Sequence, residues 1–521
     1  MTRRPGLFAS LGHGARLARA GWILLREGVF ADIDPALLPP GALAFRPLLL
    51  RLVRQDVVQD GRGPRDARLA RALGRLGPSY VKLGQFLATR PDIVGVPVAR
   101  GLESLRDRMP PFGQDVAAAI VERALGGPVS RFFSSFGPPV AAASIAQVHR
   151  AEADGRPVAV KIARPGVERR FRADLADMDF AARFAEGRSD EARRLRLREV
   201  VDTLARSVTL ELDFRLEAAA ASEFAANNSD DPEFRVPAVD WDRTARHVLV
   251  TEWIDGLPLS DVGALREAGL DTAALGRVVL QSFLRHAMRD GFFHADMHGG
   301  NLFADRQGRL VAVDFGIMGR LGLKERRFLA EILFGFITKD YRRVAQVHFD
   351  AGYVPPHHSV EEFAQAIRAI GEPIHARRAD EISMARLFTL LFEITALFDM
   401  RTRTELVLLQ KTMVVVEGVA RELDPHLDMW RTSEPVVRDW IENNIGPAAQ
   451  VRQAGLTLES VLRLAGRAPA ILARLENLAE EGAAAAPGAV RGLEEAGDAA
   501  SRMGHWLLWL VAGGMLVLLF R

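Results

Sequence analysis

The sequence predicts an α+β fold with two lobes, and three observations support this prediction. Short segments of strand character are concentrated at about residues 140–254. A single long helical segment, at about residues 199–226, lies among them, and almost everything after Ser260 has a helical pattern. Strands and helices segregated in this way along a chain are typical of α+β proteins. The lobes are expected to join near Glu252–Gly256.

Length and composition fit a globular protein with several domains. The chain has 521 residues, 48% of them hydrophobic and 26% charged, which is the balance of a folded protein. The formal net charge of +2 gives no indication of nucleic-acid binding. Cysteine is absent, which excludes disulfides, thiolate metal sites and a cysteine nucleophile.

Lysine is rare in this chain, because only five of the 68 basic residues are lysine. Lysine is retained most readily where a compact ammonium does something that a planar guanidinium cannot do. Two of the five, Lys82 and Lys161, fall inside the motifs described below.

The first 44 residues are predicted to form a basic amphipathic segment. Arg16, Arg19 and Arg26 stand among apolar residues at helical spacing, and the pattern lacks the cleavage site of a secretory signal. Such a helix could lie on an anionic membrane surface or pack on the main body of the protein. Both interpretations stay open at this point.

Residues 45–124 are predicted to form a helical extension, with breaks at Gly77-Pro78 and Pro110-Pro111. The first lobe follows at 125–254, where two short strands flank a turn at Asp154-Gly155, a typical hairpin sequence. The second lobe is expected at 255–430, mostly helical, with one short hairpin near residues 302–313.

The C-terminal part is predicted to be a helical linker at 431–504 followed by a membrane-anchoring helix at 505–521. Trp506–Phe520 is a run of 15 residues without a charge. A helix of that length spans about 22 Å, short of the roughly 30 Å hydrocarbon core. Snorkelling of Arg521 and local thinning of the bilayer could make up the difference. The alternative is a buried C-terminal core helix.

The densest cluster of chemically active residues runs from His294 to Asn301 and continues at Asp314-Phe-Gly316. Phosphoryl transfer from ATP requires a carboxylate near the acceptor and oxygen ligands for magnesium. Asp296, followed by Asn301 and then by Asp314, has the order and spacing that protein kinases use. We therefore expect Asp296 to be catalytic and Asn301 and Asp314 to bind Mg²⁺.

The same loop allows a second interpretation. His294, Asp296 and His298 alternate and could bind a metal as a His-x-Asp-x-His motif. That interpretation leaves Asn301 and Asp314 without a role, so we prefer one in which His294 fixes the loop through hydrogen bonds.

Lys161 ends the sequence Val-Ala-Val-Lys and is the candidate ammonium for the α- and β-phosphates of ATP. Its carboxylate partner should come from the helix predicted at 199–226. Glu211 and Glu217 would point about 120° apart on that helix, so two lysines could satisfy them where one could not. The alternative for Glu211 is an exposed pair with Arg215.

The glycine-rich loop that covers the phosphates in ordinary kinases is missing. An alanine-rich turn takes its place, and Cβ atoms prevent the close backbone approach that glycines allow. We expect this turn and the junction between the lobes to contact the nucleotide; the candidate residues are Ala141, Ala142, Ala143, Ser144, Glu252 and Ile254.

The combination of these motifs resembles the UbiB family of atypical protein-kinase-like proteins. Val81-Lys-Leu-Gly-Gln85 is similar to the family's Lys-x-Gly-Gln signature, and Ala141–Ser144 to its alanine-rich loop. Glu211-Leu-Asp213 resembles its Glu-x-Asp motif, and His294–Asn301 its catalytic loop. Glu417–Pro425 is similar too, and the resemblance covers roughly residues 45–430.

The resemblance implies a two-lobed kinase-like fold whose N-terminal extension folds over the active site. There Lys82 would meet Glu211 while Glu217, a catalytic residue, pairs with Lys161. The gating residues implied are Lys82, Gly84, Gln85, Glu211 and Asp213.

The family further implies ATPase or kinase activity with ATP or ADP and Mg²⁺, in support of ubiquinone biosynthesis. The implied partners are a prenylated phenol or quinone lipid, the membrane and other enzymes of quinone biosynthesis. The implied location is a bacterial-type inner membrane, with the kinase-like part facing the cytoplasm. Two rival functions are a non-catalytic carrier of prenylated intermediates and a polyprenylphenol monooxygenase, which would need a redox cofactor.

Departures from the family pattern are visible in two places. The catalytic loop reads His-Gly-Gly-Asn, where relatives commonly have a proline before the glycine, and the tail offers one short apolar segment rather than two. An Ala-Pro-Glu element is also absent after Asp314, which argues against docking of an extended peptide substrate.

Overall fold

The computed structural model describes residues 7–29, 66–88, 94, 96–102, 105, 109–188, 193, 196–375, 394, 397–400 and 404–446. The chain separates into two compact units, Met1–Trp440 and Ile441–Arg521. The predicted anchor at 505–521 and most of the predicted linker lie outside the described residues. Among the helices that are described, none has the length and apolar character needed to cross a membrane.

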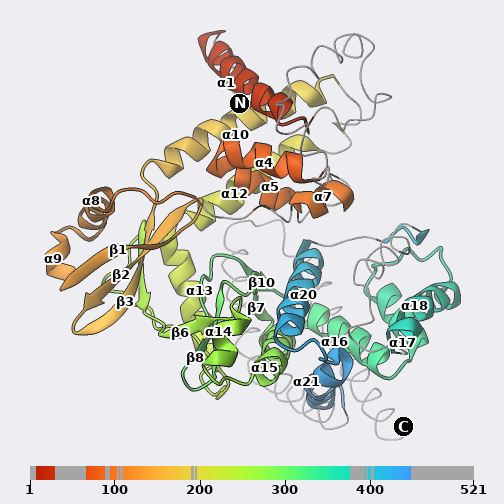
Figure 1. The fold of residues 1–521 in the computed structure, drawn as a ribbon. Coiled ribbons are helices and arrows are strands. Elements are labelled where there is room, and N and C mark those ends of the chain that lie inside the picture. Colours follow the sequence, from red (N-terminus) through yellow and green to blue (C-terminus); the bar gives the residue numbers. More distant parts are fainter. Residues whose placement is uncertain are drawn as a thin grey trace, which may run out of the picture. The chain divides into compact units, whose positions relative to one another are not determined.

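The first lobe contains a four-stranded antiparallel sheet (Figure 1). Its strands are, in spatial order, β1 (Ser135–Ala142), β2 (Ala146–Ala153), β3 (Arg156–Ala163) and β5 (Val248–Glu252). The predicted hairpin is confirmed: Asp154 and Gly155 form the turn between β2 and β3, both with positive φ (50° and 73°). Asp-Gly is favoured in such a turn because both residues tolerate left-handed backbone geometry.

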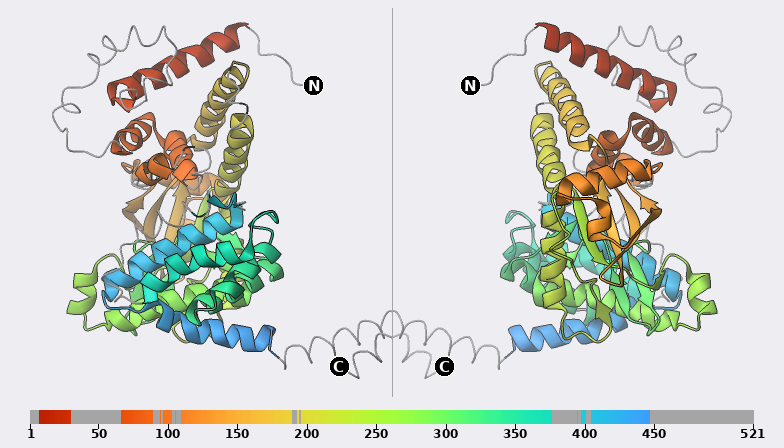
Figure 2. Two further views of the ribbon diagram at one scale, coloured as in Figure 1. Left: turned by 90° about the vertical axis from the view of Figure 1, so that its right-hand side faces the viewer. Right: turned by 90° about the vertical axis from the view of Figure 1, so that its left-hand side faces the viewer.

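Helices cover both faces of this sheet. On one face, α8 (Gln114–Leu125) packs through Ala117 and Val121 on the buried residues of β3 and β5. On the other face, three helices share a core with the sheet: α10 (Val167–Glu186), α12 (Leu197–Glu211) and α13 (Phe214–Asn227). Figure 2 shows α10 and α12 running side by side as a helical hairpin.

The single long helix predicted at 199–226 is wrong, because the chain forms two helices there. α12 ends at Glu211, and α13 begins at Phe214. Asp213 accepts a hydrogen bond from the backbone N–H of Arg215 (3.2 Å) and caps α13. An aspartate at this position stabilises a helix start and favours turn geometry for itself, so the direction of the chain changes between the two glutamates.

The described part of the N-terminal extension is mostly helical, with a break at Gly77. Its helices are α4 (Asp66–Leu76), α5 (Pro78–Ala88) and α7 (Val96–Leu102). The first helix, α1 (Leu7–Arg26), contacts α4 and α10. Arg16 forms a two-pronged ion pair with the buried Asp177 of α10 (2.6 and 2.8 Å). The described part of α1 therefore supports packing on the main body.

The second lobe begins with β6 (Gly256–Pro258), followed by α14 (Val262–Glu267) and α15 (Thr272–Arg285). The predicted hairpin is confirmed as β8 (Leu302–Asp305) and β9 (Leu310–Ala312). β6 and β4 (Phe234–Arg235) extend it to a sheet of order β4-β9-β8-β6. Further helices complete the lobe: α16 (Leu323–Ile337), α17 (Tyr341–Asp350), α18 (Val360–His375), α20 (Thr404–Leu423) and α21 (Met429–Asn444).

The prediction of one hairpin among helices after Ser260 was incomplete. α15 continues into a π-helical turn, η3 (His286–Asp290). The short strand β7 (Phe292–His294) then pairs with β10 (Met318–Arg320). This small sheet flanks the loop that carries Asp296 and Asn301, and so fixes both ends of the motif region.

Candidate functional site

Lys161 brings three elements together. It stands on β3 between Val160 and Ile162, which are both fully buried, so its side chain leaves the strand on the opposite face. Its Nζ donates to both carboxylate oxygens of Glu217 on α13 (2.7 and 3.0 Å) and to Oδ1 of Asp314 (3.0 Å). One ammonium therefore links the first lobe to the Asp-Phe-Gly segment of the second.

The charges of this triad shift one another's pKa values. Burial alone would lower the pKa of Lys161, but Asp314 and Glu217 outweigh it and raise the pKa. Burial would raise the pKa of Asp314, but Lys161 reverses the effect and holds it below its ordinary value. Burial is the largest influence on Glu217 and raises its pKa to about 7, against the opposing charge of Lys161. Asp314 is thus the carboxylate that stays ionised.

The loop after β7 holds Asn301 beside Asp296. The Asn301 side-chain N–H₂ donates to the Asp296 carbonyl (3.1 Å) and to its Oδ2 (3.3 Å). The Asn301 backbone carbonyl accepts from the N–H of Val313 (2.9 Å), the residue before Asp314. The structure therefore brings Asp296, Asn301 and Asp314 into one site. Asp314 itself has a left-handed backbone (φ 62°).

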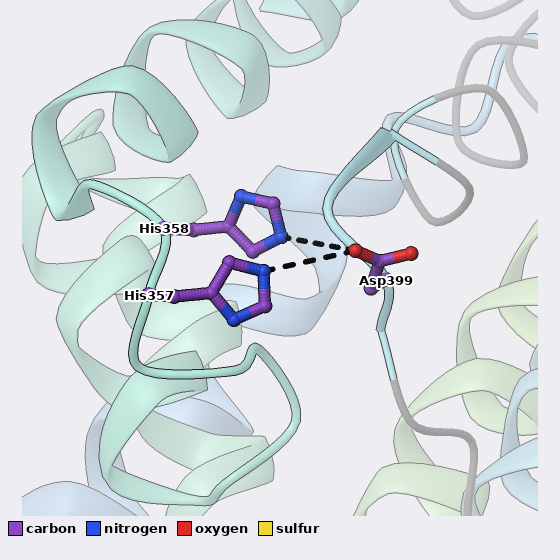
Figure 3. Close-up of side chains that lie close together, drawn as sticks. All are labelled: His357, His358 and Asp399. Atoms are coloured by element: carbon purple, nitrogen blue, oxygen red, sulfur yellow. Dashed lines mark ion pairs between the residues drawn. The ribbon is translucent and has the colours of Figure 1, made fainter.

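His294 fixes the loop, as preferred from the sequence. The residue is fully buried; its Nδ1 accepts from the Asp296 N–H (3.1 Å) and its Nε2 contacts the Val313 carbonyl (3.1 Å). Both ring nitrogens are therefore engaged with the backbone, and the His-x-Asp-x-His metal motif is wrong. Among the described residues, only His357, His358 and Asp399 form a cluster with metal-ligand spacing (Figure 3).

The His-Gly-Gly-Asn loop is held by hydrogen bonds in place of a proline. The His298 ring accepts from the Gly300 N–H (3.0 Å), and the Gly299 carbonyl accepts from the Ser260 N–H (3.1 Å). A Cβ on Gly299 would lie 3.0 Å from the Ser260 nitrogen, so the close approach to the neighbouring chain favours glycine here.

The residues around Asp314 fit a magnesium ion. The Asn301 amide nitrogen donates to Asp296, and among the described residues no hydrogen bond involves its Oδ1, which can only accept. Asp314 uses Oδ1 for Lys161 and for the Gly316 N–H (3.3 Å), and no hydrogen bond in the described part of the chain involves its Oδ2. Carboxylate and amide oxygens are the donors that Mg²⁺ prefers.

The alanine-rich segment is only partly a loop. Ala141 and Ala142 are the last residues of β1, and only Ala143 and Ser144 lie in the turn to β2. Arg164 clamps that turn: its Nε donates to the Ala143 carbonyl (2.6 Å) and its Nη2 to the Pro110 carbonyl (2.9 Å). No sequence pattern indicates Arg164, because its partners are backbone carbonyls. The turn is thereby attached to the chain that enters from the extension.

The junction between the lobes is occupied partly by structural contacts. The Glu252 carboxylate pairs with Arg235, and its backbone N–H donates to the Ala238 carbonyl (2.8 Å). By contrast, the Ile254 N–H takes part in no hydrogen bond within the described residues. Nucleotide contacts by Glu252 and Ile254 stay a prediction.

The two-lysine arrangement implied by the family resemblance is present in the structure. Lys82 on α5 forms an ion pair with Glu211 at the end of α12, with both side chains largely buried. Burial raises the pKa of Asp314, and Lys161, His294 and Lys82 lower it, with Lys82 the smallest of these influences. The alternative pair of Glu211 with Arg215 is wrong, because Arg215 pairs with Asp213 (2.7 Å).

The remaining predicted gating residues have different positions. Gly84 lies buried on α5, where a Cβ would collide with Leu105 and lie 2.7 Å from Leu73, so it permits close packing of the extension. Gln85 is half-buried one turn after Lys82 on the same helix. Asp213 caps α13 and therefore acts on the direction of the helix that carries Glu217.

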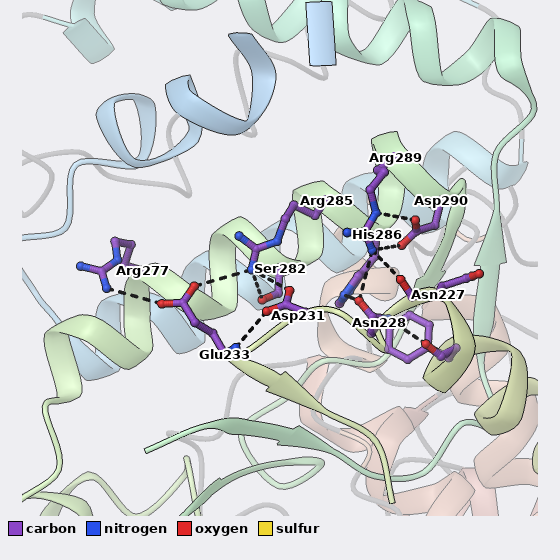
Figure 4. A network of polar contacts seen from close by, with 11 residues as sticks. Asn227, Asn228, Asp231, Glu233, Arg277, Ser282, Arg285, His286, Arg289 and Asp290 are labelled. Carbon is purple, nitrogen blue, oxygen red and sulfur yellow. Dashed lines mark hydrogen bonds and ion pairs between the residues drawn. The ribbon is translucent and has the colours of Figure 1, made fainter. Parts of the chain in front are cut away.

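A polar network fixes the far end of α13 to the second lobe (Figure 4). Oδ1 of the buried Asn228 contacts Nε2 of His286 (2.7 Å), and Arg289 donates to the Asn227 carbonyl (2.8 Å). Burial holds the pKa of His286 well below its ordinary value, so the ring is neutral. These residues have no signal in the sequence. The network anchors the helix that presents Glu217 to the same lobe as Asp314.

A strand lysine held by a helix glutamate and by the aspartate of an Asp-Phe-Gly segment, with an asparagine beside it, defines a protein-kinase-like protein. Comparison with known families agrees with this class. The model of the ABC1 atypical kinase-like domain matches residues 104–348, and that of the UbiB helical domain matches residues 367–428. The chain belongs to the UbiB family of atypical protein-kinase-like proteins.

Two relatives named probable protein kinase UbiB show how far the similarity extends. The protein of Marinobacter nauticus is 39% identical over 463 residues, which cover 88% of this chain and 84% of the relative. That of Azotobacter vinelandii is 40% identical over 408 residues, covering 77% and 76%. Among solved structures, the Rv3197–erythromycin complex from Mycobacterium tuberculosis aligns with a TM-score of 0.50 at 29% identity, covering 68% of this chain and 90% of that one.

Proposed function

We propose that this protein is an atypical kinase or ATPase that binds ATP with Mg²⁺. The observation that carries the proposal is the contact of Lys161 with both Glu217 and Asp314. An ammonium in this position can hold nucleotide phosphates, while Glu217 keeps it oriented. A purely structural ion pair would not need the neighbouring set of uncommitted oxygens on Asn301 and Asp314.

Each residue then has one role in phosphoryl transfer. Asn301 and Asp314 would hold Mg²⁺, which supplies charge neutralisation for the phosphates when bound. Asp296 positions the acceptor hydroxyl or water and accepts its proton as the acceptor oxygen bonds to the γ-phosphorus, while the bond from that phosphorus to the β–γ bridging oxygen breaks and ADP leaves. The Asn301 amide holds Asp296 by its Oδ2, which fixes the carboxylate for this task.

The clamped alanine-rich turn and the Lys82–Glu211 pair give the site its atypical character. The turn at Ala143 cannot close over phosphates as a glycine-rich loop does, because Arg164 and the Met109–Phe112 segment hold it. We infer that the extension, through Lys82, limits which acceptors reach Asp296. Water and small hydroxyl compounds fit this arrangement better than an extended peptide.

The cellular role proposed is support of ubiquinone biosynthesis at a bacterial-type inner membrane, with a prenylated phenol or quinone lipid as partner. Membership of the UbiB family motivates this role. Membrane attachment would depend on residues 505–521, which contain the uncharged run Trp506–Phe520. Removal of 505–521 should transfer the protein from the membrane to the soluble fraction of lysed cells; an unchanged distribution contradicts this anchor.

The decisive test is hydrolysis of ATP by the purified protein with Mg²⁺, with and without anionic liposomes and a prenylphenol. Asp314→Asn should lower the turnover number at least about a hundredfold, because loss of a metal ligand removes several kcal/mol of transition-state stabilisation. Asp242→Asn, an exposed carboxylate remote in the sequence from the motifs, is the matched control and should leave turnover unchanged.

The other outcomes lead to the rival functions. Bound nucleotide without any hydrolysis, together with co-purified lipid, would replace the proposal by a carrier of prenylated intermediates. Visible absorbance from a bound redox cofactor would favour the monooxygenase.

A further inference from the structure

Two adjacent histidines and one aspartate converge in the helical part of the second lobe, away from the motifs above (Figure 3). His357 and His358 lie in the loop between α17 and α18, and Asp399 lies in a turn before α20. The Nε2 atoms of both rings face the same oxygen, Oδ2 of Asp399, at 3.8 and 3.4 Å. The two rings lie against each other with centroids 4.1 Å apart.

These distances are too long for good hydrogen bonds but fit a shared metal ion. Hydrogen bonds between nitrogen and oxygen have lengths of about 2.7–3.2 Å. By contrast, two ligand atoms bonded at about 2.1 Å to one tetrahedral Zn²⁺ lie about 3.4 Å apart. All three ligand atoms of the cluster lie within 4.8 Å of one another. Nε2 of His358 is buried and has no hydrogen-bond partner, although a buried polar atom normally has one.

An ion pair alone accounts poorly for this arrangement. Both Nε2 atoms face one carboxylate oxygen at 3.8 and 3.4 Å, beyond hydrogen-bond length, and the two rings are inclined to each other by 39°. A divalent cation between the three groups needs neutral rings and satisfies both Nε2 atoms at once. Two imidazoles and a carboxylate, without a thiolate, are ligands that suit Zn²⁺ and its neighbours among the transition metals rather than Mg²⁺.

The hydrophobic core holds the backbone beside the cluster through Phe398, while the side chains of His357 and Asp399 are 65% and 69% exposed. Phe398, which precedes Asp399, is buried and packs edge-on against Phe363 of α18 (4.9 Å) and near the ring of His358 (5.2 Å). Asp399 itself has a left-handed backbone (φ 48°). A backbone fixed by a packed core limits the entropy that the cluster loses on binding a metal.

We propose that His357, His358 and Asp399 bind a divalent transition-metal ion, with Zn²⁺ as the reference ion. The ion joins the α17–α18 loop to the turn at Asp399, with water completing its coordination. This metal site shares no residue with the nucleotide site. Two of its three ligands are imidazoles, whereas the nucleotide site offers carboxylate and amide oxygens, so the two sites are independent.

The test is Zn²⁺ binding by the untagged full-length protein, stripped with a chelator and titrated against a chromophoric competitor. About one Zn²⁺ should bind per chain at this site, and Asp399→Asn should weaken binding at least about tenfold. Asparagine tolerates the left-handed backbone at this position, so the variant should fold. His357→Gln should weaken binding to a similar extent.

Two controls make the result specific. His426→Gln changes an exposed histidine and should retain Zn²⁺ binding, as should Asp314→Asn at the nucleotide site. Co²⁺ should give the visible absorption of a tetrahedral nitrogen–oxygen site, lost in Asp399→Asn. Equal Zn²⁺ affinity in the wild type, Asp399→Asn and His357→Gln would overturn the proposal, even if ATP hydrolysis proceeds as proposed.

Discussion

At the scale of single residues, the ion pair of Lys82 with Glu211 connects the extension to the triad around Lys161. Both side chains are largely buried, at 10% and 16% exposure. An ion pair removed from water is weak evidence for stability, so its position suggests a different role. The charge of Glu211 also raises the pKa of Glu217. A change in the Lys82–Glu211 pair would therefore reach the carboxylate that orients Lys161 in the nucleotide site.

We expect Lys82→Met to change the affinity for ATP or the turnover number by about fivefold or more, because it uncouples the extension from the site. The same change leaves Glu211 without its partner and should cost about 1–3 kcal/mol of unfolding free energy. Nucleotide titration, steady-state ATP hydrolysis and urea unfolding measure these effects.

The double variant Lys82→Met with Glu211→Gln separates the two effects. It removes the unpaired charge and should recover most of the lost stability, while the nucleotide effect persists. Lys324→Met, at an exposed lysine of α16, is the control and should change neither quantity. Unaltered nucleotide binding and turnover in Lys82→Met would contradict a gating role.

The residue pairs around the site were predictable to a large extent from the sequence, and their supporting contacts were not. The family resemblance implied both lysine–glutamate pairs, and both are present, although the two glutamates lie on separate helices rather than on the single helix predicted. Arg164 escaped prediction because it binds backbone carbonyls. Any arginine in the chain could do the same, so residue type and spacing carry no signal for such a contact.

At the scale of elements, α13 depends on its anchor at Asn228. Asn228 is buried, contacts His286 by Oδ1 and donates to the Phe224 carbonyl (2.8 Å). Asn228→Ala should lower the unfolding free energy by about 1–3 kcal/mol, because it leaves the buried ring of His286 without its partner. The ATP turnover number should also fall, since α13 carries Glu217.

Asn227→Ala is the matched control for this anchor. Asn227 is exposed and contributes its backbone carbonyl to Arg289, which an alanine retains. Its urea midpoint and turnover should stay at the values of the wild type. Equal effects of the two substitutions would show that the Asn228 side chain does not anchor the helix.

The packing of α5 gives a second prediction at this scale. Gly84→Ala places a methyl group against Leu105 and Leu73, and overpacking of this kind typically costs about 1–3 kcal/mol. Gly74→Ala on the neighbouring helix α4 meets nothing within 4 Å. It should instead stabilise the protein by up to about 1 kcal/mol, since alanine is the better helix former. Thermal unfolding of both variants measures the contrast; the same sign for both would contradict it.

Among the elements, long periodic segments and hairpins were predictable, and short or interrupted ones were not. Asp154-Gly155 identifies its turn by residue type alone. The break at Leu212-Asp213 was missed, because a helix cap within an otherwise helical pattern is a weak local signal. β7 and β10 have three residues each, too few to show alternation, and they exist because each pairs with the other.

At the scale of the whole molecule, the sheet of the first lobe joins the extension to the site. One face of the sheet packs on α8, and the other packs on α10, α12 and α13. Three side chains of α5 contact this second core: Tyr80, Leu83 and Phe86. The family and its kinase-like core were predictable because they rest on motifs. The docking of the extension through apolar contacts required the structure.

The pH dependence of stability is a property of the whole chain, because neutral histidines are buried in both lobes. His149, His286 and His294 are each 0% exposed, and burial lowers the pKa of each below the ordinary 6.5. As the pH falls below 6.5, the unfolded chain takes up protons that the folded chain does not, so these groups destabilise the fold. Each can contribute up to about 1.4 kcal/mol per pH unit.

Glu217 acts in the opposite direction. Its pKa is about 7 in the folded chain against 4.5 ordinarily, so the folded state gains protons first as the pH falls from 7 to 4.5. Burial also lowers the pKa of His348 and raises that of Glu417. Four histidines against two glutamates predict a net loss of unfolding free energy between about pH 6.5 and 5, measured by urea unfolding at constant ionic strength. Glu217→Gln removes one opposing group and should make the loss steeper. A free energy of unfolding that stays level or rises over this interval in the wild type would show that the buried histidines do not govern its acid stability.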